Sequence, residues 1–335
     1  MTSEKILSPD RPVSPESSSA GFPLLAVRGL KVHFPGSEGP VTPLDRVDLE
    51  IREGECFGVI GESGSGKTLL CLSILRLLPP EARTEGKVLF RGRDLFSLPA
   101  SELQSLRGRE IGAVFQNPST SLDPVFSAGY QLKEALRAGS DLSGGQEESL
   151  KARALRILRK VSFRDPKMRF GQYPHQLSGG QKQRVMIGMG IAAVPSFIIA
   201  DEPTKGLDTR TRQNITALLQ ETCRESTMLL ITHDLDLAGI LCDTLAVMYA
   251  GEIVEIAKKR DFFDSPFHPF SQGLLSSLPA GGLQVIPGAA PSLLSLPQGC
   301  RFSERCLHSS KLCRKKHPDL FPAAGGRKVR CFLYA

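Results

Sequence analysis

"GESGSGKT", residues 61–68, is the strongest indication of the fold of this chain. The strand-like run at residues 55–61 leads directly into it, and residues 69–78 follow with the length and periodicity of a helix. Closely spaced glycines let the backbone turn so that its N–H groups point at phosphate oxygens, and a helix that follows adds the positive end of its dipole. Strand, glycine-rich loop and helix in this order therefore predict a phosphate-binding α/β core.

The pattern G-x-x-x-x-G-K-[ST] also predicts a role for its side chains. Lys67 is expected to reach the β- and γ-phosphates, and the Thr68 hydroxyl is expected to ligate Mg²⁺. A chance glycine-rich turn is the alternative, and the flanking strand and helix argue against it. The predicted phosphate-binding residues are Gly61, Glu62, Ser63, Gly64, Ser65, Gly66, Lys67 and Thr68.

A second buried strand is predicted to end in two acids. In "FIIADE", residues 197–202, four apolar residues precede Asp201 and Glu202. Neighbouring strand residues point in different directions, so the two acids can take different tasks. Asp201 is expected in the Mg²⁺ shell, and Glu202 is expected to polarise an attacking water. An exposed strand end is the weaker alternative, because the preceding residues are apolar.

The rest of the chain supplies more strand-like and helix-like segments. Further strand-like runs lie at residues 24–34, 47–51, 86–92, 111–116, 228–234 and 245–256. Helix-like segments lie at residues 129–139 and 147–161, between the run at 111–116 and the second of two LSGGQ strings. This order predicts a helical insertion in the α/β unit.

The ordered set of motifs resembles the ATP-binding subunits of ABC transporters over about residues 24–262. This resemblance implies a P-loop NTPase fold of the α/β class: a RecA-like core, an antiparallel β subdomain and a helical subdomain at about residues 117–178. It also implies an ATPase that uses ATP and Mg²⁺.

The same resemblance assigns four further residues. Phe34 matches the aromatic that stacks on adenine, although a core strand phenylalanine is a serious alternative. Gln116 matches the Q-loop residue that touches Mg²⁺ and the attacking water, His233 the switch histidine at the γ-phosphate, and Asp208 the D-loop aspartate. Many members carry a small residue before Ala-Leu-Asp in the D-loop, whereas this chain has Lys205-Gly206-Leu207. The implied Mg²⁺ ligands are Thr68, Gln116 and Asp201.

The string LSGGQ occurs twice, at residues 142–146 and 177–181. Acids follow the first copy, Glu147 and Glu148; they suit a helix N-terminus but would repel a triphosphate, so residues 141–146 are interpreted as a helix-capping turn. A basic, apolar-periodic helix follows the second copy, which matches the family signature. The signature residues implied are Ser178, Gly179, Gly180 and Gln181. In the family they face ATP on a partner, so a second, homologous ATPase subunit is implied, as a heterodimer.

Half of the eight cysteines lie near the C-terminal end: Cys300, Cys306, Cys313 and Cys331. Disulfides are unfavourable in a reducing cytosol, which leaves metal ligation. Because no tight pair typical of structural zinc is present, the spacing favours an iron–sulfur cluster over zinc, with unligated cysteines as a third possibility. The segment also looks like the end of oligopeptide/dipeptide-type importer ATPases, which implies a 4Fe-4S cluster. Nearby basic runs are expected to offset thiolate charge rather than to rest on anionic lipid.

Length and composition set the outer limits. The chain has 335 residues and a net charge of +7, with no apolar run long enough for a membrane span and no N-terminal signal pattern. A mixed solvated surface is favoured over nucleic-acid binding. We expect a disordered tail at residues 1–22, an ATPase domain at 23–262 and an extension at 263–335.

The resemblance therefore implies an ATP-hydrolysing subunit of an importer for oligopeptides, dipeptides or nickel, peripheral on the cytoplasmic face of the inner membrane. Its implied partners are the second ATPase, two transmembrane permeases and, indirectly, an extracytoplasmic solute-binding protein. Three alternative functions are less consistent with the sequence. A soluble ATPase acting on DNA lacks its usual long coiled coil or zinc insertion here, and a translation factor lacks its second cassette. A binding-only module is opposed by intact Lys67, Asp201, Glu202 and His233.

Overall fold

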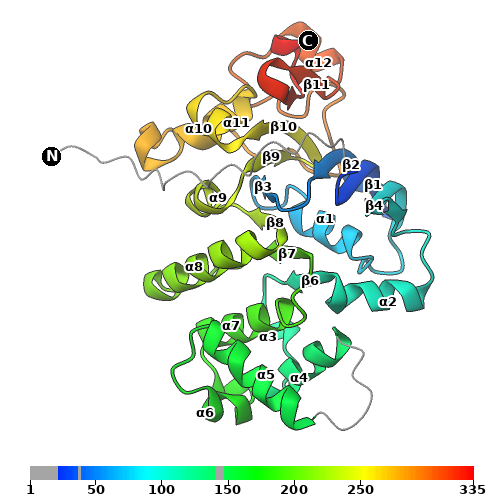
Figure 1. Cartoon of the computed structure of the whole chain (residues 1–335). Coiled ribbons are helices and arrows are strands. Elements are labelled where there is room, and N and C mark those ends of the chain that lie inside the picture. Colours follow the sequence, from blue (N-terminus) through cyan, green and yellow to red (C-terminus); the bar gives the residue numbers. More distant parts are fainter. Residues whose placement is uncertain (1–21, 37–38, 140–146) are drawn as a thin grey trace, which may run out of the picture.

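A computed structural model describes residues 22–36, 39–139 and 147–335. The expected tail, apart from Phe22, and the turn expected at residues 141–146 lie outside this range. Two sheets organise the described chain: one of eight strands and one of four. Figure 1 shows a layer of helices below the large sheet and the C-terminal segment above it.

The eight-stranded sheet carries the core of the molecule. Its order is β11-β12-β10-β9-β3-β8-β7-β6, and the five strands from β9 to β6 are parallel neighbours. Strands β3, β7, β8 and β9 are buried along their whole length, as expected for parallel strands covered on both faces. The strands are β3 (Cys56–Ile60), β6 (Ile111–Val114), β7 (Phe197–Asp201), β8 (Thr227–Thr232), β9 (Thr244–Tyr249), β10 (Glu252–Lys258), β11 (Phe321–Ala323) and β12 (Arg327–Val329).

The smaller sheet is antiparallel, in the order β2-β1-β4-β5. Side chains of a strand alternate between its faces, so Phe57 and Val59 of β3 pack toward this smaller sheet, while Cys56 and Ile60 join the core on the opposite face. The predicted antiparallel β subdomain is thus confirmed. Its strands are β1 (Leu25–Phe34), β2 (Val41–Ile51), β4 (Arg83–Phe90) and β5 (Arg93–Asp94), and helices α1 (Lys67–Ile74) and α2 (Ala100–Arg109) pack with them.

Helices cover the other face of the large sheet. The segments predicted as helices at residues 129–139 and 147–161 form α4 and α5, which confirms the helical insertion. Their apolar sides meet α7 in a shared core. The insertion and its neighbours comprise α3 (Pro118–Ser121), α4 (Ala128–Ala138), α5 (Glu147–Lys160), α6 (Pro166–Gly171), η1 (Pro174–Gln176) and α7 (Gly179–Gly190), followed after β7 by α8 (Thr209–Glu225) and α9 (Leu235–Leu241).

The strand-like run at residues 245–256 is two strands rather than one. β9 and β10 are antiparallel and are joined by Ala250 and Gly251, whose φ angles are +45° and +85°. Two positive φ angles in a two-residue connection make a tight hairpin turn that suits the strand twist. The apolar pattern did not reveal this turn, because alanine and glycine interrupt it without adding polarity. Gly251 N–H also donates to the Ser65 carbonyl at 2.9 Å, so the hairpin touches the glycine-rich loop.

The C-terminal segment, defined here as residues 259–335, continues the main sheet. β12 pairs with β10, with Val329 opposite Glu255, and β11 pairs with β12. The buried Glu255 carboxylate accepts the N–H groups of Phe267 and His268, each at 2.8 Å. The domain boundary expected near residue 263 stays a prediction. Strands from both sides of it, β10 and β12, share one sheet. The segment contains α10 (Lys259–Asp264), α11 (Pro269–Ser276), η2 (Pro279–Gly281), α12 (Lys311–Lys315), η3 (Ala324–Gly326) and η4 (Phe332–Tyr334).

Within the described ranges, no helix has both the length and the apolar character that a membrane crossing requires.

The hairpin contact predicts a difference between two glycines of similar backbone conformation. Gly251 and Gly92 both have positive φ in two-residue turns, but only at Gly251 would a Cβ meet another atom, the Pro43 carbonyl oxygen at 2.6 Å. Gly251→Ala should therefore lower the free energy of unfolding by about 1–3 kcal/mol more than Gly92→Ala, in urea titrations of the two variants. Equal losses would contradict the proposed close approach.

Candidate active site at the edge of the main sheet

Four of the predicted motifs lie at one edge of the main sheet because of its strand order. β3, β8, β7 and β6 are adjacent and parallel, so their carboxyl ends meet at the same edge. The glycine-rich loop follows β3, and His233 follows β8. Asp201 ends β7, and Gln116 lies two residues beyond β6, partly buried. The topology thus brings four separate motifs into one site.

The glycine-rich loop presents its backbone to this edge. Gly64 and Gly66 have φ angles of +80° and +105°, which glycine adopts without strain. A Cβ at Gly66 would lie 2.9 Å from the Pro43 carbonyl oxygen, so the position also needs glycine for close packing. No side chain caps the first turn of α1. Its N–H groups and the unpaired buried Ser65 hydroxyl can therefore bind an anion.

Lys67 lies inside this loop. Its Nζ donates to the carbonyl oxygens of Gly61 and Glu62, each at 2.8 Å. Burial lowers the pKa of Lys67, while the negative charges of Glu202 and Asp201 act in the opposite direction. The ammonium is thus held among oxygen atoms at the place where the motif positions phosphates.

Asp201 has the character of a metal ligand. The residue is 1% exposed, and its Oδ1 has no hydrogen-bond partner. Burial raises its pKa, whereas a hydrogen bond from Thr68 lowers it. An unpaired buried carboxylate oxygen beside a hydroxyl is costly unless a cation binds there, and oxygen donors are the ligands that Mg²⁺ prefers. The donor set of Asp201 and Thr68 therefore fits the expected Mg²⁺.

Glu202 is held by the strand next to it. His233 N–H donates to Glu202 Oε1 at 3.1 Å, and His233 Nδ1 lies 2.7 Å from the same oxygen. The Thr232 hydroxyl lies 3.4 Å from Glu202 Oε2. Glu202 has a φ of +47°, which a non-glycine residue rarely adopts. A strained backbone with a fixed carboxylate beside the expected metal ligand is typical of a catalytic base.

The second LSGGQ string begins α7, as predicted. Ser178 Oγ accepts the N–H of Gln181, and the Gln181 side chain accepts the Ser178 N–H, which together form a capping box. Gly180 packs next to the D-loop: a Cβ there would lie 3.1 Å from Thr211 and 3.6 Å from Leu207. Ser178 and Gly179 are exposed, and Figure 1 shows α7 in the helical layer, apart from α1.

The D-loop residues have local roles as well. The Asp208 side chain accepts the Thr211 N–H at 3.0 Å and caps α8, and these hydrogen bonds with Thr211 lower the pKa of Asp208. Gly206 has a φ of +71°, so the glycine that departs from the family pattern occupies a left-handed turn position. Any residue with a β-carbon would be strained at this position, even a small one.

Phe34 ends β1 opposite Val41 and is partly buried against the core of the smaller sheet. Both the adenine-stacking role and the core role are compatible with this position, so stacking stays a prediction.

The four C-terminal cysteines line one small cavity, together with His268 and Phe302. Among the described residues, no group of three or more His, Cys, Asp or Glu side chains is arranged to hold a metal ion. Burial raises the pKa of Cys300 to about 12 and also raises that of Cys306 and Cys331. In each of these three, the thiol accepts an N–H from the residue two positions later, which lowers the pKa: Phe302, His308 and Leu333.

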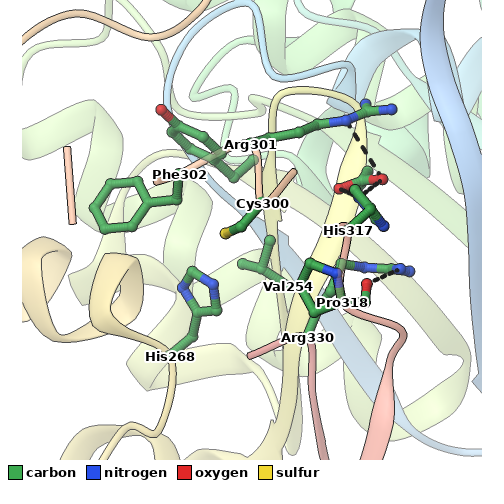
Figure 2. A pocket seen from close by; sticks show the side chains of 10 residues that line it. Val254, His268, Cys300, Arg301, Phe302, His317, Pro318 and Arg330 are labelled. Carbon is green, nitrogen blue, oxygen red and sulfur yellow. Dashed lines mark hydrogen bonds and ion pairs between the residues drawn. The ribbon is translucent and has the colours of Figure 1, made fainter. Parts of the chain in front are cut away.

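Three arginines next to these cysteines were not expected at the site. Arg301, Arg305 and Arg330 are 8%, 8% and 4% exposed. Rather than offsetting thiolate charge or facing lipid, they contact groups of the ATPase core. Figure 2 shows that the side chains of Cys300 and Arg301 point in different directions. The Arg301 guanidinium pairs with the Glu252 carboxylate, which also contacts His317. Their only sequence signal is adjacency to Cys300, Cys306 and Cys331.

Two family models match the chain. The model described as ABC transporter matches residues 44–205, which contain the glycine-rich loop, the second LSGGQ string and both strand acids. The model described as Oligopeptide/dipeptide transporter, C-terminal region, matches residues 254–313.

Relatives match over nearly the whole chain. Identity to the Oligopeptide transport ATP-binding protein OppD of Salmonella typhimurium is 40% over 318 residues, which cover 92% of this chain and 93% of that protein. Identity to the Dipeptide transport ATP-binding protein DppD of Haemophilus influenzae is 40% over 316 residues, with coverage of 92% and 94%.

Solved structures share the fold. A dimeric, post-hydrolysis state of the ATP-binding cassette MJ0796 bound to ADP and Pi has a TM-score of 0.64 and 30% identity, covering 70% of this chain and 99% of that chain. The cbiO1 protein of Clostridium perfringens, part of the transporter complex cbiONQ, has a TM-score of 0.59 and 26% identity, covering 73% and 92%.

The geometry predicts separable roles for the two acids. Glu202→Gln removes the base but keeps the hydrogen-bonding shape, so ATP hydrolysis should fall by about 10²–10⁴-fold while MgATP binding persists. Phosphate release by the complex with its partner subunits measures hydrolysis, and equilibrium nucleotide binding to the full chain measures MgATP affinity. Glu221→Gln, an exposed change on α8, is the matched control and should retain wild-type activity. Normal turnover in the Glu202 variant would refute its assignment as the base.

Proposed function

Because the chain belongs to the ABC transporter ATP-binding proteins, and within them to the oligopeptide/dipeptide group, we propose that it energises the import of oligopeptides or dipeptides across a membrane, with nickel as a related cargo. The observation that carries the proposal is the fixed pair of Glu202 and His233 beside Asp201, whose Oδ1 has no partner. A chain that only bound nucleotide would not need this strained base. The transport relatives give no support to the DNA or translation alternatives.

The residues of the site divide the work of ATP hydrolysis. Backbone N–H groups of the glycine-rich loop and Lys67 bind the phosphates, since Lys67 can exchange its two carbonyl partners for phosphate oxygens. Thr68 and Asp201 would hold Mg²⁺, with Gln116 at the same edge, and a bound ion would supply positive charge to offset charge on the phosphates. Glu202 takes a proton from the attacking water, and His233 keeps its carboxylate in place and faces the γ-phosphate.

Hydrolysis is proposed to require a second subunit. Ser178 and Gly179, at the start of α7, are exposed, and α7 lies apart from α1, the helix that follows the phosphate loop (Figure 1). They are therefore available to the ATP of a partner. The dimeric state of the ATP-binding cassette MJ0796 is compatible with such pairing. The partner is proposed to be a homologous ATPase, forming a heterodimer.

The pair of ATPases would bind two permease subunits at the cytoplasmic face of the membrane, and the permeases would receive cargo from an extracytoplasmic binding protein. The support is that both relatives, OppD and DppD, are named as transport ATP-binding proteins.

The cysteine cavity is proposed to hold a 4Fe-4S cluster, with zinc as the alternative. The support is the donor set: four thiols line one cavity, and three of them accept N–H groups, as thiolate ligands of metal sites commonly do. A bound cluster would convert the buried neutral thiols to thiolates, and its role would be to fix the C-terminal segment.

The transport proposal predicts a paired result. In proteoliposomes with the permeases and the second ATPase, Ser178→Arg should abolish ATP-driven uptake of labelled dipeptide, because the large side chain blocks the partner's nucleotide. Ser143→Arg, in the first LSGGQ string outside the described residues, should leave uptake nearly unchanged. Uptake of nickel but not of peptide would reassign the cargo, and loss of uptake in both variants would contradict the choice of signature.

The cluster proposal predicts colour and iron. Chain purified without oxygen should be brown, absorb broadly near 400 nm and contain iron, and Cys306→Ser should lose both. Cys71→Ser, a buried core cysteine away from the cavity, is the control and should keep them. A colourless protein that contains zinc would establish the alternative.

A further inference from the structure

Arg305, in the C-terminal segment, binds a residue of the phosphate loop. Its Nη1 and Nη2 donate to the two carboxylate oxygens of Glu62 at 2.9 and 3.0 Å. Such a paired arrangement is among the strongest side-chain contacts and fixes both position and orientation. The contact joins residues 243 positions apart in sequence, so it links the end of the chain directly to the nucleotide site.

The arginine is itself rigidly placed. Its Nε donates to the Pro287 carbonyl at 2.9 Å, and Nη1 also lies 3.3 Å from the Tyr249 hydroxyl. The guanidinium lies 5.7 Å from the centre of the Tyr249 ring and 5.8 Å from that of Phe302. The Arg305 side chain is 7% exposed, so the pair with Glu62 is only weakly screened by solvent.

The Glu62 carboxylate places a negative charge next to the expected phosphates. It is the second residue of "GESGSGKT", and its backbone carbonyl accepts a hydrogen bond from Lys67 Nζ at 2.8 Å. Burial lowers the pKa of Lys67, and the negative charge of the Glu62 side chain is one of the charges that act on the ammonium in the opposite direction. An unpaired carboxylate here would repel a triphosphate and compete with it for Lys67.

We propose that Arg305 is a positioning residue for ATP binding: it neutralises the Glu62 carboxylate and holds it in place, so that Lys67 stays available to the phosphates. Arg301 supports the same loop from a second side. It donates to the Ala250 carbonyl and pairs with Asp45 at 2.6 Å, and the neighbouring Gly251 N–H donates to Ser65 in the loop. The C-terminal segment is thus part of the nucleotide site.

This inference concerns the ATP site of the chain and does not depend on which solute is transported or on a bound cluster. Its test therefore uses nucleotide binding to the full chain in the Glu202→Gln background, with MgATP as the probe. Peptide uptake and iron content are measured separately, so the MgATP-binding result can be interpreted even if the transport or cluster proposal fails.

Arg305→Gln should raise the Kd for MgATP by about tenfold, because it leaves the Glu62 charge unpaired beside the phosphates. Adding Glu62→Gln to that variant should restore the Kd to within about threefold of the starting value, since the repelling charge is gone. Arg314→Gln removes the same charge from an exposed residue of the segment and should leave the Kd unchanged. In the assembled complex with Glu202 intact, Arg305→Gln should raise the KM for ATP with little change in kcat.

A merely structural role for Arg305 gives a different pattern. In that case Glu62→Gln would not rescue the affinity, and kcat would fall together with the folded fraction. An unchanged Kd in Arg305→Gln would also overturn the proposal. If Arg305→Gln does not fold, Arg305→Lys replaces it: it keeps the charge but loses the two-pronged contact, so a smaller increase in Kd with the same rescue is expected.

Discussion

The close approach between the phosphate loop and its surroundings is the constraint on which the rest of the structure depends. At Gly66 and Gly251 a single added carbon would meet the same carbonyl, that of Pro43, at 2.9 and 2.6 Å. The smaller sheet, the β9–β10 hairpin and the loop are therefore packed backbone to backbone. Such contacts leave no room for side chains, so the loop position is set by both sheets and not by its own sequence alone.

This packing explains how distant motifs act as one site. The parallel order of β3, β8, β7 and β6 places the loop, His233, Asp201 and Glu202 on one edge. The strained Glu202 is held by β8 and by His233 directly after it. The same edge is incomplete, because the signature helix α7 begins elsewhere in the helical layer. Under the proposed pairing, a second subunit would complete the site, and ATP hydrolysis would then depend on assembly.

Much of the fold and of the candidate site was predictable from local sequence. The glycine loop and the acids after "FIIA" have short-range signals, because strand, turn and helix each follow from neighbouring residues. The hairpin at Ala250-Gly251 was missed, since it interrupts an apolar run without a polar break. The contact between Arg305 and Glu62 was missed for a different reason: pairing between residues so far apart in the chain depends on tertiary structure, and the basic runs around the cysteines suggested surface or cluster charge instead.

The phosphate loop and the C-terminal segment are proposed to form one nucleotide site. Hydrogen–deuterium exchange of the full chain, with and without MgATP, tests this proposal most directly by following residues 61–68 and 299–306 together. If the two segments form one site, MgATP should slow exchange in both, while residues 311–315 of helix α12 stay unchanged. Protection confined to residues 61–68 and the strand ends would contradict it.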